Sequence, residues 1–405
     1  MSQEASERKK LLLISPMLHQ GGFERVCVET ARLMWPYYDV SVLIFTRKDL
    51  HYDIKGIKVI DINVPARDGL LFKSLNLLKR IRRVRHIKAH HGFDYSYSFG
   101  ASANRVNVLT RTGEKVITSL RGSIDLDNRG EMKRWCRRSD LLVSVSRDMM
   151  ERVRQTYGYK NNTFLYNPLD IDRVCADAKE PITDFPFPAD CKTVISVGRA
   201  DEQKGYWHLI KAFSIAAAKQ EDLRLVILGD GDFTPYAALA EKLGVADKCA
   251  FPGVRKNPFP YVAASTLFVL SSNHEGFPNA LLEAMALSKP VIATDCVSGP
   301  KEILLSKEDF QTIDANPGWK KMYATYGVLL PDMSPVFDDT VTVTGEEQAL
   351  AYEILSLCRD DERYRAYQIK GRERAEQFSP ERYAQNLRTI LDRLSERDTD
   401  AEESA

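Results

Sequence analysis

Two glutamates separated by seven residues are the first candidates for chemistry in this sequence. Glu275 and Glu283 lie in SSNHEGFPNALLEAMALSKPVIATD (271–295), where Pro278 favours a helix that starts there and runs to about Leu287. Glu283 then lies about 7 to 8 Å along the helix axis from its start. The two carboxylates therefore suit opposite ends of an extended ligand better than one shared bond. From spacing alone, two solvent-exposed glutamates remain the alternative.

Between these glutamates the chain offers a site for an anion. The backbone N–H groups around Phe277 to Ala280 form a helix N-terminus, which attracts a diphosphate. Upstream, VISVGRADEQKGYWHLIKAF (194–213) ends a strand at Gly198 and places Arg199 and Lys204 in the following loop. A guanidinium and an ammonium group at the C-terminal end of a strand could neutralise a departing nucleoside diphosphate. The alternative is two ordinary surface cations in a polar loop.

The elements that must position these groups alternate between short apolar runs and longer helical patterns. LLLIS (11–15) precedes a helical stretch from about Glu24 to Met34, and VSVLIF (40–45) follows it. The same rhythm restarts at KTVISVG (192–198), continues with a helix near Tyr206, and reaches LRLVILG (223–229). Strand and helix alternation predicts parallel sheets with crossover helices. The sequence therefore predicts an α/β protein with two Rossmann-like lobes.

Domain boundaries follow from composition. EPITDFPFPAD (180–190) is rich in Pro and acidic residues, and we interpret it as the linker. The prediction is an N-terminal lobe over 1–183, a C-terminal lobe over 184–377, a terminal helix over 378–395, and a disordered acidic tail over 396–405. The stretch from about Phe310 to Asp339 shows few periodic runs, and we interpret it as an insertion or long loop.

Composition excludes several classes of protein. Lys and Arg number 57 against 56 Asp and Glu, so we expect no nucleic-acid partner. The seven cysteines are odd in number and scattered, without zinc spacing, which predicts reduced thiols and no metal centre. The first residues, MSQEASERKK, are polar, and the apolar run after them is too short for a signal peptide or a spanning helix. We expect a cytoplasmic protein.

The ordered set of motifs resembles the family 4 retaining glycosyltransferases of the GT-B fold, of the bacterial polysaccharide and lipid-linked glycan assembly type. In the second half the resemblance is carried by VGR with a Lys five residues after the Arg, LVILGDGD, FPGV, HEGFPNALLE and CVSGPKEIL. In the first half it is carried by SPMLHQGGFERV, LLVSVSRDMMERV and FLYNPLDID. The resemblance implies two lobes facing across a deep cleft, with a C-terminal helix returning toward the N-terminal lobe.

The same resemblance implies roles for individual residues. Arg199 and Lys204 would bind the donor diphosphate, Glu275 would hold the hydroxyls of the transferred sugar, and Glu283 the ribose. Gly21 and Gly22 would let the N-terminal lobe approach the diphosphate. The remaining donor-binding residues would surround the sugar and phosphate, cover the nucleobase, or lie close to the nucleotide: Gly229, Pro252, Gly253, Val254, Arg255, Gly276, Phe277, Pro278, Asn279 and Ala280.

One departure from the family pattern concerns the loop SLRGSID (119–125). Arg121 stands where many relatives have a His, and a guanidinium cannot act as a general base near neutral pH. A positioning or phosphate-binding role and a purely structural role both remain open for Arg121. Asp125 is a candidate contact to the sugar or acceptor. The segments DLD (125–127) and DID (170–172) match a metal-binding pattern only superficially, and we interpret them as turn or cap residues.

Residues 70–91, LLFKSLNLLKRIRRVRHIKAHH, interleave apolar side chains with ten Lys, Arg and His. As a helix this segment could lie on an anionic membrane surface, with Leu78, Ile81 and Val84 facing inward or toward lipid. That position would suit a lipid-linked acceptor. The alternative is a helix packed on the first lobe with a solvated basic face.

The sequence therefore predicts transfer of a sugar from an NDP-sugar, UDP-linked by preference, with retained anomeric configuration. The acceptor would be a glycan or a polyprenyl-diphosphate-linked sugar on the inner face of the cell membrane. No cofactor and no metal are expected. Two rival hypotheses are a GT-B nucleotide-sugar epimerase or hydrolase that needs no acceptor, and a non-catalytic donor-binding subunit of a polysaccharide assembly complex.

Overall fold

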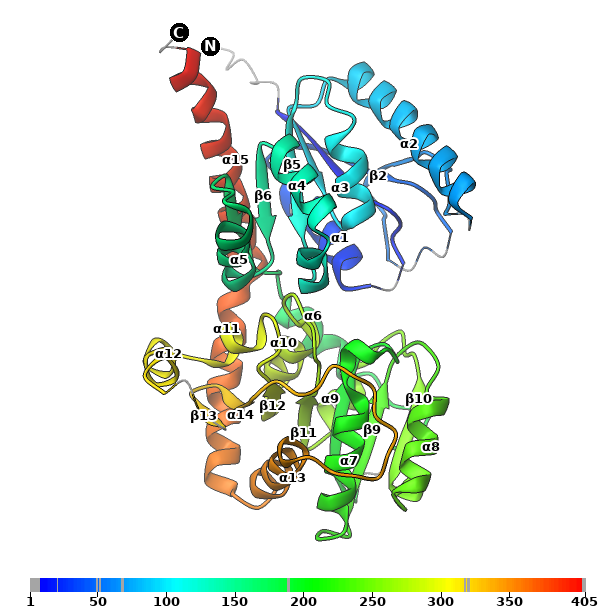
Figure 1. Cartoon of the computed structure of the whole chain (residues 1–405), viewed down its shortest axis with the longest axis vertical. Helices are drawn as coiled ribbons and strands as arrows, with labels where there is room; N and C mark the ends of the chain where they lie inside the picture. The colour runs from blue at the N-terminus through cyan, green and yellow to red at the C-terminus, as the bar shows by residue number, and fades with distance from the viewer. Residues whose placement is uncertain are drawn as a thin grey trace. The chain divides into compact units, whose positions relative to one another are not determined.

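The computed structural model describes residues 8–19, 21–48, 50, 52–66, 69–187, 190–316, 318 and 321–402. The chain forms two compact units, shown in Figure 1. Unit 1 comprises Met1–Pro168 together with Pro380–Ala405, and unit 2 comprises Leu169–Ser379. Each unit has its own sheet and its own hydrophobic core.

Unit 1 is built on a parallel sheet of seven strands in the order β3-β2-β1-β4-β5-β6-β7. The strands are β1 (Lys10–Ser15), β2 (Asp39–Ile44), β3 (Lys58–Asp61), β4 (Tyr95–Ser98), β5 (Lys115–Leu120), β6 (Leu141–Ser144) and β7 (Asn162–Phe164). The strand order reverses between β1 and β4, which are neighbours in the sheet. In open α/β sheets, ligands bind beyond the carboxyl ends of the strands at such a reversal.

Both faces of the unit 1 sheet are covered, which explains why β1 reads as a continuous apolar run. Leu11 and Leu13 pack with α1 (Gly22–Met34) and α15 (Pro380–Glu402), whereas Leu12 and Ile14 pack with α2 (Leu70–His91) and α3 (Ala101–Val108). Alternate residues of a strand point to opposite faces, so each run supplies two cores. The remaining helices of unit 1 are α4 (Arg129–Arg138) and α5 (Arg147–Tyr157), with a short 3-10 helix η1 (Ser123–Asp127).

Unit 2 repeats this plan with a seven-stranded sheet in the order β10-β9-β8-β11-β12-β14-β13. The strands are β8 (Lys192–Val197), β9 (Leu223–Leu228), β10 (Cys249–Gly253), β11 (Leu267–Leu270), β12 (Val291–Thr294), β13 (Met322–Ala324) and β14 (Gly327–Leu330). β13 and β14 pair antiparallel and the other pairs are parallel. The order reverses between β8 and β11.

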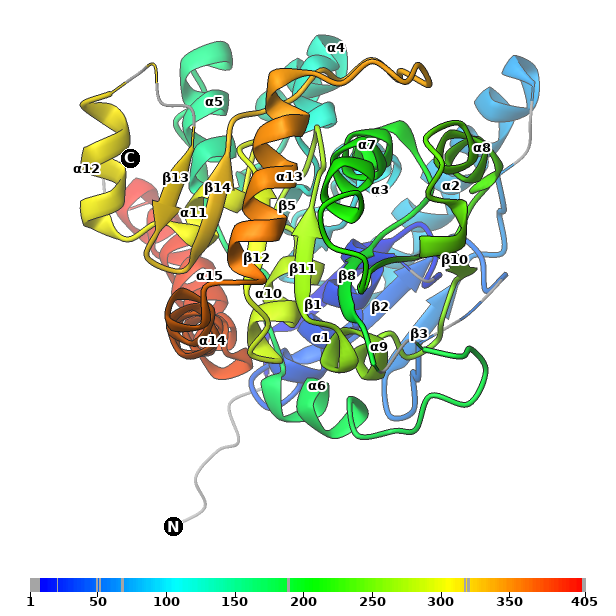
Figure 2. The ribbon, with the colours of Figure 1, turned by 90° about the horizontal axis from the view of Figure 1, so that it is seen from below.

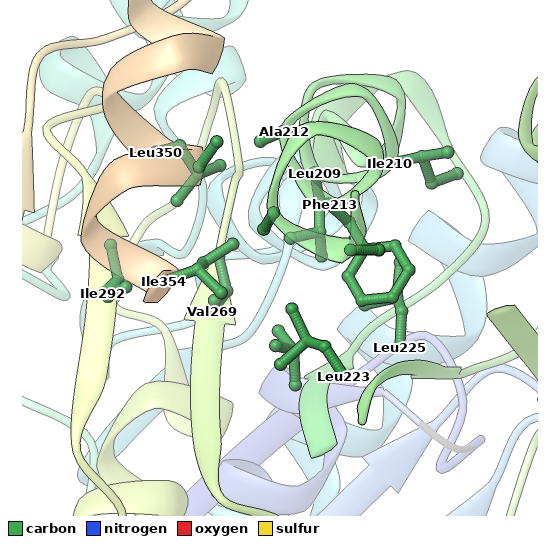
Figure 3. Close-up of a cluster of buried hydrophobic side chains, with 14 of the residues drawn as sticks. Leu209, Ile210, Ala212, Phe213, Leu223, Leu225, Val269, Ile292, Leu350 and Ile354 are labelled. Carbon is green, nitrogen blue, oxygen red and sulfur yellow. The ribbon is translucent and has the colours of Figure 1, made fainter. Parts of the chain in front are cut away.

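Helices sandwich the unit 2 sheet, as Figure 2 shows from below. One face carries α7 (Tyr206–Ala217), α8 (Thr234–Lys242) and α13 (Gly345–Leu357). Side chains of α7 and α13 meet those of β9, β11 and β12 in the core drawn in Figure 3. The other face carries α9 (Phe259–Ala264) and α10 (Asn279–Ala286), with α6 (Ile171–Asp177) and α14 (Asp361–Ala375) packed on α10. Short helices α11 (Pro300–Leu304) and α12 (Lys307–Asp314) complete the unit.

The division of the chain differs from the boundary predicted at residues 183 and 184. The boundary along the chain lies between Pro168 and Leu169, because α6, which precedes the predicted linker, packs on α9 and α10 of unit 2. The linker is also held by unit 2: Asp184 pairs with Arg255, and the ring of Phe187 packs against Tyr261. Residues 188 and 189 of the predicted linker lie outside the described residues.

Two further predictions were wrong. The stretch near 310–339 is not one long loop, because it contains the end of α12, β13 and β14, and β14 pairs with β12 inside the sheet. Among the described residues, the part after β14 is irregular. The predicted tail after residue 395 is not disordered as far as Glu402, because α15 continues to that residue; residues 403–405 lie outside the described residues. The helix contributes Tyr383, Leu387 and Leu391 to the unit 1 core, which anchors it.

Candidate functional site

The reversal of strand order in unit 2 explains why two distant segments meet. β8 and β11 are neighbours in the sheet, so the loop after β8 and the loop after β11 leave the same edge side by side. Arg199 and Lys204 follow β8, and Glu275 follows β11. The sequence places these residues far apart, and the topology brings their loops together.

Lys204 and Glu275 form an ion pair at this edge. Lys204 Nζ lies 2.6 Å from Glu275 Oε1, and the same oxygen accepts a hydrogen bond from Ser272 Oγ at 2.7 Å. The side chains of Lys204 and Glu275 are 17% and 9% exposed, so the pair is largely shielded from water. A charge-assisted bond in such a setting is shorter and stronger than one between neutral groups. The pair therefore fixes a cation of the loop after β8 next to a carboxylate of the loop after β11.

Hydrogen bonds between the two loops fix this geometry. Asn273 N donates to Gln203 O at 2.8 Å, Ser271 Oγ donates to Lys204 O at 2.9 Å, and Gln203 Nε2 donates to His274 O at 2.6 Å. Gly205 has φ +58°, and a Cβ there would lie 2.2 Å from Ser271 O. A side chain at Gly205 would thus separate the loops as well as strain the backbone.

Glycines next to the ion pair allow close backbone approach. A Cβ on Gly198 would lie 2.9 Å from Lys204 Cε and 2.7 Å from the Tyr206 hydroxyl oxygen. A Cβ on Gly229 would lie 1.7 Å from Gly198 O. Gly229 N also donates to Gly253 O at 3.2 Å, which joins the ends of β9 and β10. Packing against the neighbouring strand therefore accounts for the glycine at 229, independently of the predicted nucleotide contact.

The predicted helix after Glu275 is present as α10, which begins at Asn279 with Pro278 as its N-cap residue. The turn before it rests on the segment after β12: Ser298 Oγ donates to Gly276 O at 3.0 Å, and Glu275 N donates to Val297 O at 2.9 Å. No side chain caps the N-terminus of α10 among the described residues. A helix N-terminus without a side-chain cap favours an anion.

Glu283 lies inside α10, as predicted, and is buried rather than on a solvated helix face. The surrounding turn residues are also buried, including Phe277, whose ring packs against Phe378 with centroids 5.4 Å apart. Buried carboxylates are unusual outside paired or functional sites. The alternative of two solvent-exposed glutamates is therefore wrong for both Glu275 and Glu283.

Two predicted cations are held by other carboxylates. Arg199 Nη2 lies 3.2 Å from Asp201 Oδ2, and the Arg199 side chain is 69% exposed. Arg255 Nε lies 2.7 Å from Asp184 Oδ2, and its Nη1 donates to the carbonyl oxygen of Pro252 at 2.6 Å. Val254, in the loop expected to cover the base, is exposed. The structure thus unites Lys204 and Glu275, whereas Arg199 and Arg255 each pair with a carboxylate nearby.

In unit 1, Gly21 and Gly22 lie at the N-terminus of α1, as predicted. The carboxylate of Glu24 folds back over Gly21, where a Cβ would lie 2.1 Å from Glu24 Oε2. A carboxylate in the first turn of a helix is stabilised by the helix dipole. The carboxylate of Glu24 therefore fills the space beside Gly21.

Arg121 and Asp125 follow β5 in unit 1. Arg121 Nη1 donates to Asn167 Oδ1 at 3.0 Å, and its guanidinium carbon lies 4.7 Å from the centroid of the Phe99 ring. Asp125 is in η1, where burial raises the pKa of its carboxyl to about 6. A carboxyl with a raised pKa at the ligand edge of a sheet is a candidate functional group.

The two DxD segments serve as turn and cap residues, as predicted. Asp170 is the N-cap of α6 and accepts a hydrogen bond from Arg173 N, and residues 125–127 lie in η1. Across the part of the chain that the structure describes, no group of three or more His, Cys, Asp and Glu side chains could hold a metal ion. No helix among the described residues is long and apolar enough to cross a membrane.

The predicted basic helix is present as α2 with the same bounds. Its inner side holds Val84 and Lys88, and Lys88 Nζ lies 2.7 Å from Glu114 Oε1 in the core of unit 1. Phe72, Leu75 and Leu78 are exposed by 53%, 52% and 58%. Val84 thus faces the core, whereas Leu78 faces solvent. We call the exposed side chains at helical spacing the outer face of α2: Phe72, Leu75, Leu78, Lys79, Arg82 and Arg85.

Several contributors were missed from sequence. Ser272, Gln203 and Asn273 lock the loops around Lys204, and only the short polar run before Glu275 hinted at them. No local sequence pattern indicated that Asp184 would pair with Arg255 or that Glu24 would pack over Gly21, because both contacts depend on the tertiary fold.

Comparison with known proteins agrees with this architecture. Residues 20–173 match the family model described as "Glycosyltransferase Family 4", and residues 178–317 match the model described as "Glycosyl transferases group 1". HepE of Anabaena, solved in complex with UDP and glucose, superposes with a TM-score of 0.72 at 19% identity, covering 95% of this chain and all of that one. Sucrose-phosphate synthase of Thermosynechococcus elongatus superposes with a TM-score of 0.72 at 17% identity, covering 96% of this chain and 99% of that chain.

Sequence relatives span nearly the whole chain. An uncharacterised glycosyltransferase of Methanocaldococcus jannaschii is 29% identical over 88% of this chain and 93% of its own length. An N-acetylgalactosamine-N,N'-diacetylbacillosaminyl-diphospho-undecaprenol 4-alpha-N-acetylgalactosaminyltransferase of Campylobacter jejuni is 24% identical over 95% of this chain and 99% of its own length. The fold is thus of the GT-B type, and the matches to family models and relatives indicate a glycosyltransferase. The two matched segments, residues 20–173 and 178–317, resemble the glycosyltransferases of the family 4 type.

Proposed function

We propose that the chain transfers a hexose or N-acetylhexosamine from a UDP-sugar to a glycan or polyprenyl-diphosphate-linked acceptor, with retention of anomeric configuration. The preference for UDP is supported by structural neighbours solved with UDP and with UDP-glucose. The preference for such an acceptor is supported by the Campylobacter relative, which is named for a diphospho-undecaprenol-linked substrate. The pathway would be synthesis of a cell-surface polysaccharide on the cytoplasmic side.

The Lys204–Glu275 pair is the single observation that carries this proposal. Lys204 would bind a diphosphate oxygen, and Glu275 would accept hydrogen bonds from hydroxyls of the transferred sugar. Because Lys204 and Ser272 already orient Glu275, the carboxylate needs no rearrangement when the sugar arrives. Such preorganisation is a large contribution to transition-state stabilisation.

In the proposed reaction, the bond between sugar C1 and the diphosphate oxygen breaks while the acceptor oxygen bonds to C1 on the same face. The acceptor hydroxyl proton passes to an oxygen of the departing diphosphate, so charges and atoms balance without a protein nucleophile. Lys204, Arg199 and the N-terminal N–H groups of α10 would stabilise the negative charge that develops on the diphosphate. For Arg199 this requires exchange of Asp201 for the diphosphate, which its exposed position allows.

Lys204, Arg199 and the N-terminal N–H groups of α10 would supply the positive charge that a divalent cation supplies in other transferases. We therefore propose that turnover needs no metal. Turnover that survives a strong chelator would agree with this. Loss of activity on chelation and recovery on adding Mg²⁺ or Mn²⁺ would contradict it.

We also propose that the outer face of α2 docks on an anionic membrane surface, where a lipid-linked acceptor resides. Residues 70–91 contain no acidic side chain, so the field of this helix is uniformly positive. Its first half exposes large apolar side chains and its second half exposes Arg and Lys. Lipid-surface helices combine these two features.

A thermal-shift screen tests the donor assignment. UDP-, GDP- and ADP-sugars are each added to the wild-type protein and to Lys204→Ala, with Lys242→Ala as a matched control, because Lys242 is an exposed lysine of unit 2 paired with Asp339. A ligand present well above its dissociation constant stabilises the folded protein by several kcal/mol. We expect stabilisation by UDP-sugars in the wild type and the control, and its loss in Lys204→Ala. Equal stabilisation of all three proteins would contradict the assignment.

A further inference from the structure

Arg121 lies at the ligand edge of the unit 1 sheet. It follows β5, which pairs with β4, and β4 lies at the reversal of strand order beside β1. Its guanidinium stacks on Phe99, the residue after β4, at 4.7 Å from the ring centroid. Stacking fixes the plane of the guanidinium, so the directions of its N–H groups are fixed as well.

One edge of this guanidinium has no acceptor. Nη1 donates to Asn167 Oδ1, whereas Nε and Nη2 are buried and have no hydrogen-bond acceptor among the described residues. Nε–H and Nη2–H are parallel and form the fork with which arginine binds two oxygens of a phosphate. A buried donor without an acceptor is costly, and the cost is larger when the donor is charged.

The neighbours of Arg121 do not compensate its charge. The guanidinium acts electrostatically on Cys27, Tyr97 and Tyr383, and burial raises the pKa of each, so all three are neutral at pH 7. Asp125 is close in sequence, but burial raises the pKa of its carboxyl and so disfavours the charged form of this group. Among the residues that the structure describes, no carboxylate accepts a hydrogen bond from Arg121. The carboxylate of Glu24, which acts electrostatically on the same Cys27, packs over Gly21.

We infer that Arg121 is the anchor of a phosphate-binding site in unit 1, which holds two oxygens of a substrate phosphate group through Nε and Nη2. The site itself stands on the geometry of unit 1. The source of the phosphate rests on the proposed function, under which both the donor and the acceptor carry a diphosphate. Because a guanidinium stays protonated, Arg121 binds and orients this group and moves no proton.

The site is tested first with inorganic pyrophosphate, independently of catalysis. The full-length protein carries Arg199→Ala and Lys204→Ala, which weaken the unit 2 site, and thermal stability is followed as pyrophosphate is added. Arg121→Gln and Arg121→Lys are then introduced separately. The matched control is Arg152→Gln, which removes an exposed arginine of unit 1 paired with Asp148.

We expect saturable stabilisation in the double variant and in the control. The half-saturating concentration should rise roughly tenfold or more in Arg121→Gln, because a bidentate charged contact is lost. Arg121→Lys should bind more weakly than arginine, because it keeps the charge and loses the fork. An unchanged half-saturating concentration in a folded Arg121→Gln protein would overturn the inference. If Arg121→Gln does not fold, an unchanged value in Arg121→Lys would overturn it instead.

The source of the phosphate is identified with Arg121→Gln in the otherwise wild-type chain. A raised Kd for the UDP-sugar assigns the site to the donor diphosphate, whereas a raised KM for a polyprenyl-diphosphate-linked acceptor at unchanged donor Kd assigns it to the acceptor. If neither constant changes, Arg121 binds no substrate phosphate and the inference fails. If the wild type transfers no sugar but pyrophosphate binding still depends on Arg121, the proposed function fails and the site stands.

Discussion

Lys204 Nζ lies 2.6 Å from Glu275 Oε1, although the two residues are 71 positions apart in the chain. The contact is possible because β8 and β11 are adjacent at the reversal of strand order, so the loops that follow them share one edge of the sheet. In the proposed reaction the two residues act on different parts of one ligand: Lys204 on the diphosphate and Glu275 on the sugar. Replacing Lys204 and replacing Glu275 should therefore have different effects on nucleotide binding and turnover.

Replacing Lys204 should impair both binding and turnover. We expect Lys204→Ala to lower kcat/KM by about 100-fold or more, because a positioned cation that meets developing charge contributes several kcal/mol. The measurement is steady-state UDP release in the presence of acceptor. Lys242→Ala, on the exposed surface of unit 2, should retain full activity. Near-normal turnover in folded Lys204→Ala protein would remove Lys204 from the site.

Replacing Glu275 should separate the sugar from the nucleotide. Glu275→Gln keeps the shape of the side chain but loses hydrogen bonds that are donated to a charged carboxylate, which are worth about 1.5 to 3 kcal/mol each. We expect turnover to fall by roughly 10- to 100-fold, while the Kd of UDP, which has no sugar, changes little. Titration calorimetry with UDP and with the UDP-sugar gives both values. A loss of UDP binding equal to the loss of UDP-sugar binding would contradict the assignment to the sugar.

Asp125 should make stability depend on pH. Burial raises its pKa to about 6 in the folded protein, above its ordinary value, so the folded state binds more protons than the unfolded state between about pH 4 and 6. Its contribution to stability is thus present below pH 4 and is lost as the pH rises to 6. Asp125→Asn should raise the free energy of unfolding at pH 7.5 by on the order of 1 to 2 kcal/mol. The measurement is urea unfolding at several pH values.

If Asp125 contacts the sugar or the acceptor, Asp125→Asn should lose activity while it gains stability. A variant that is both more active and less stable at pH 7.5 would contradict the raised pKa and the proposed contact together.

The outer face of α2 should bind anionic vesicles. Leu75→Glu with Leu78→Glu should abolish cosedimentation with vesicles rich in anionic lipid, and Arg82→Glu with Arg85→Glu should do the same, because insertion needs both apolar area and charge. Ile369→Glu, which changes an exposed apolar residue of α14, is the matched control. Wild-type binding should weaken as salt is added. Equal binding of all variants would show that another surface, or none, meets the membrane.

The sheets and the main helices could be predicted because local patterns determine them. LLLIS contains a continuous apolar run because both faces of β1 are buried, and residues 70–91 show helical spacing. The acidic tail was misread because composition alone gave no sign that α15, anchored in unit 1 by Leu387 and Leu391, continues to Glu402. The hairpin of β13 and β14 was missed because both strands are only three or four residues long.

The types of the site residues could be predicted, but their partners could not. Neighbouring motifs indicated Lys204 and Glu275, and strand order then placed them in contact. Nothing near Arg255 indicated Asp184, and nothing near Gly21 indicated that Glu24 would fold over it. Such contacts depend on distances between segments, which a single sequence does not encode locally.

The most direct test of the account is titration calorimetry of UDP-glucose into the wild-type protein, Lys204→Ala and Lys242→Ala. We predict saturable binding to the wild type and to Lys242→Ala with equal Kd, and binding weakened at least about tenfold in Lys204→Ala. Equal Kd values for all three folded proteins, or no binding of UDP-glucose or any other nucleotide sugar to the wild type, would contradict the claim that Lys204 and Glu275 form the donor site.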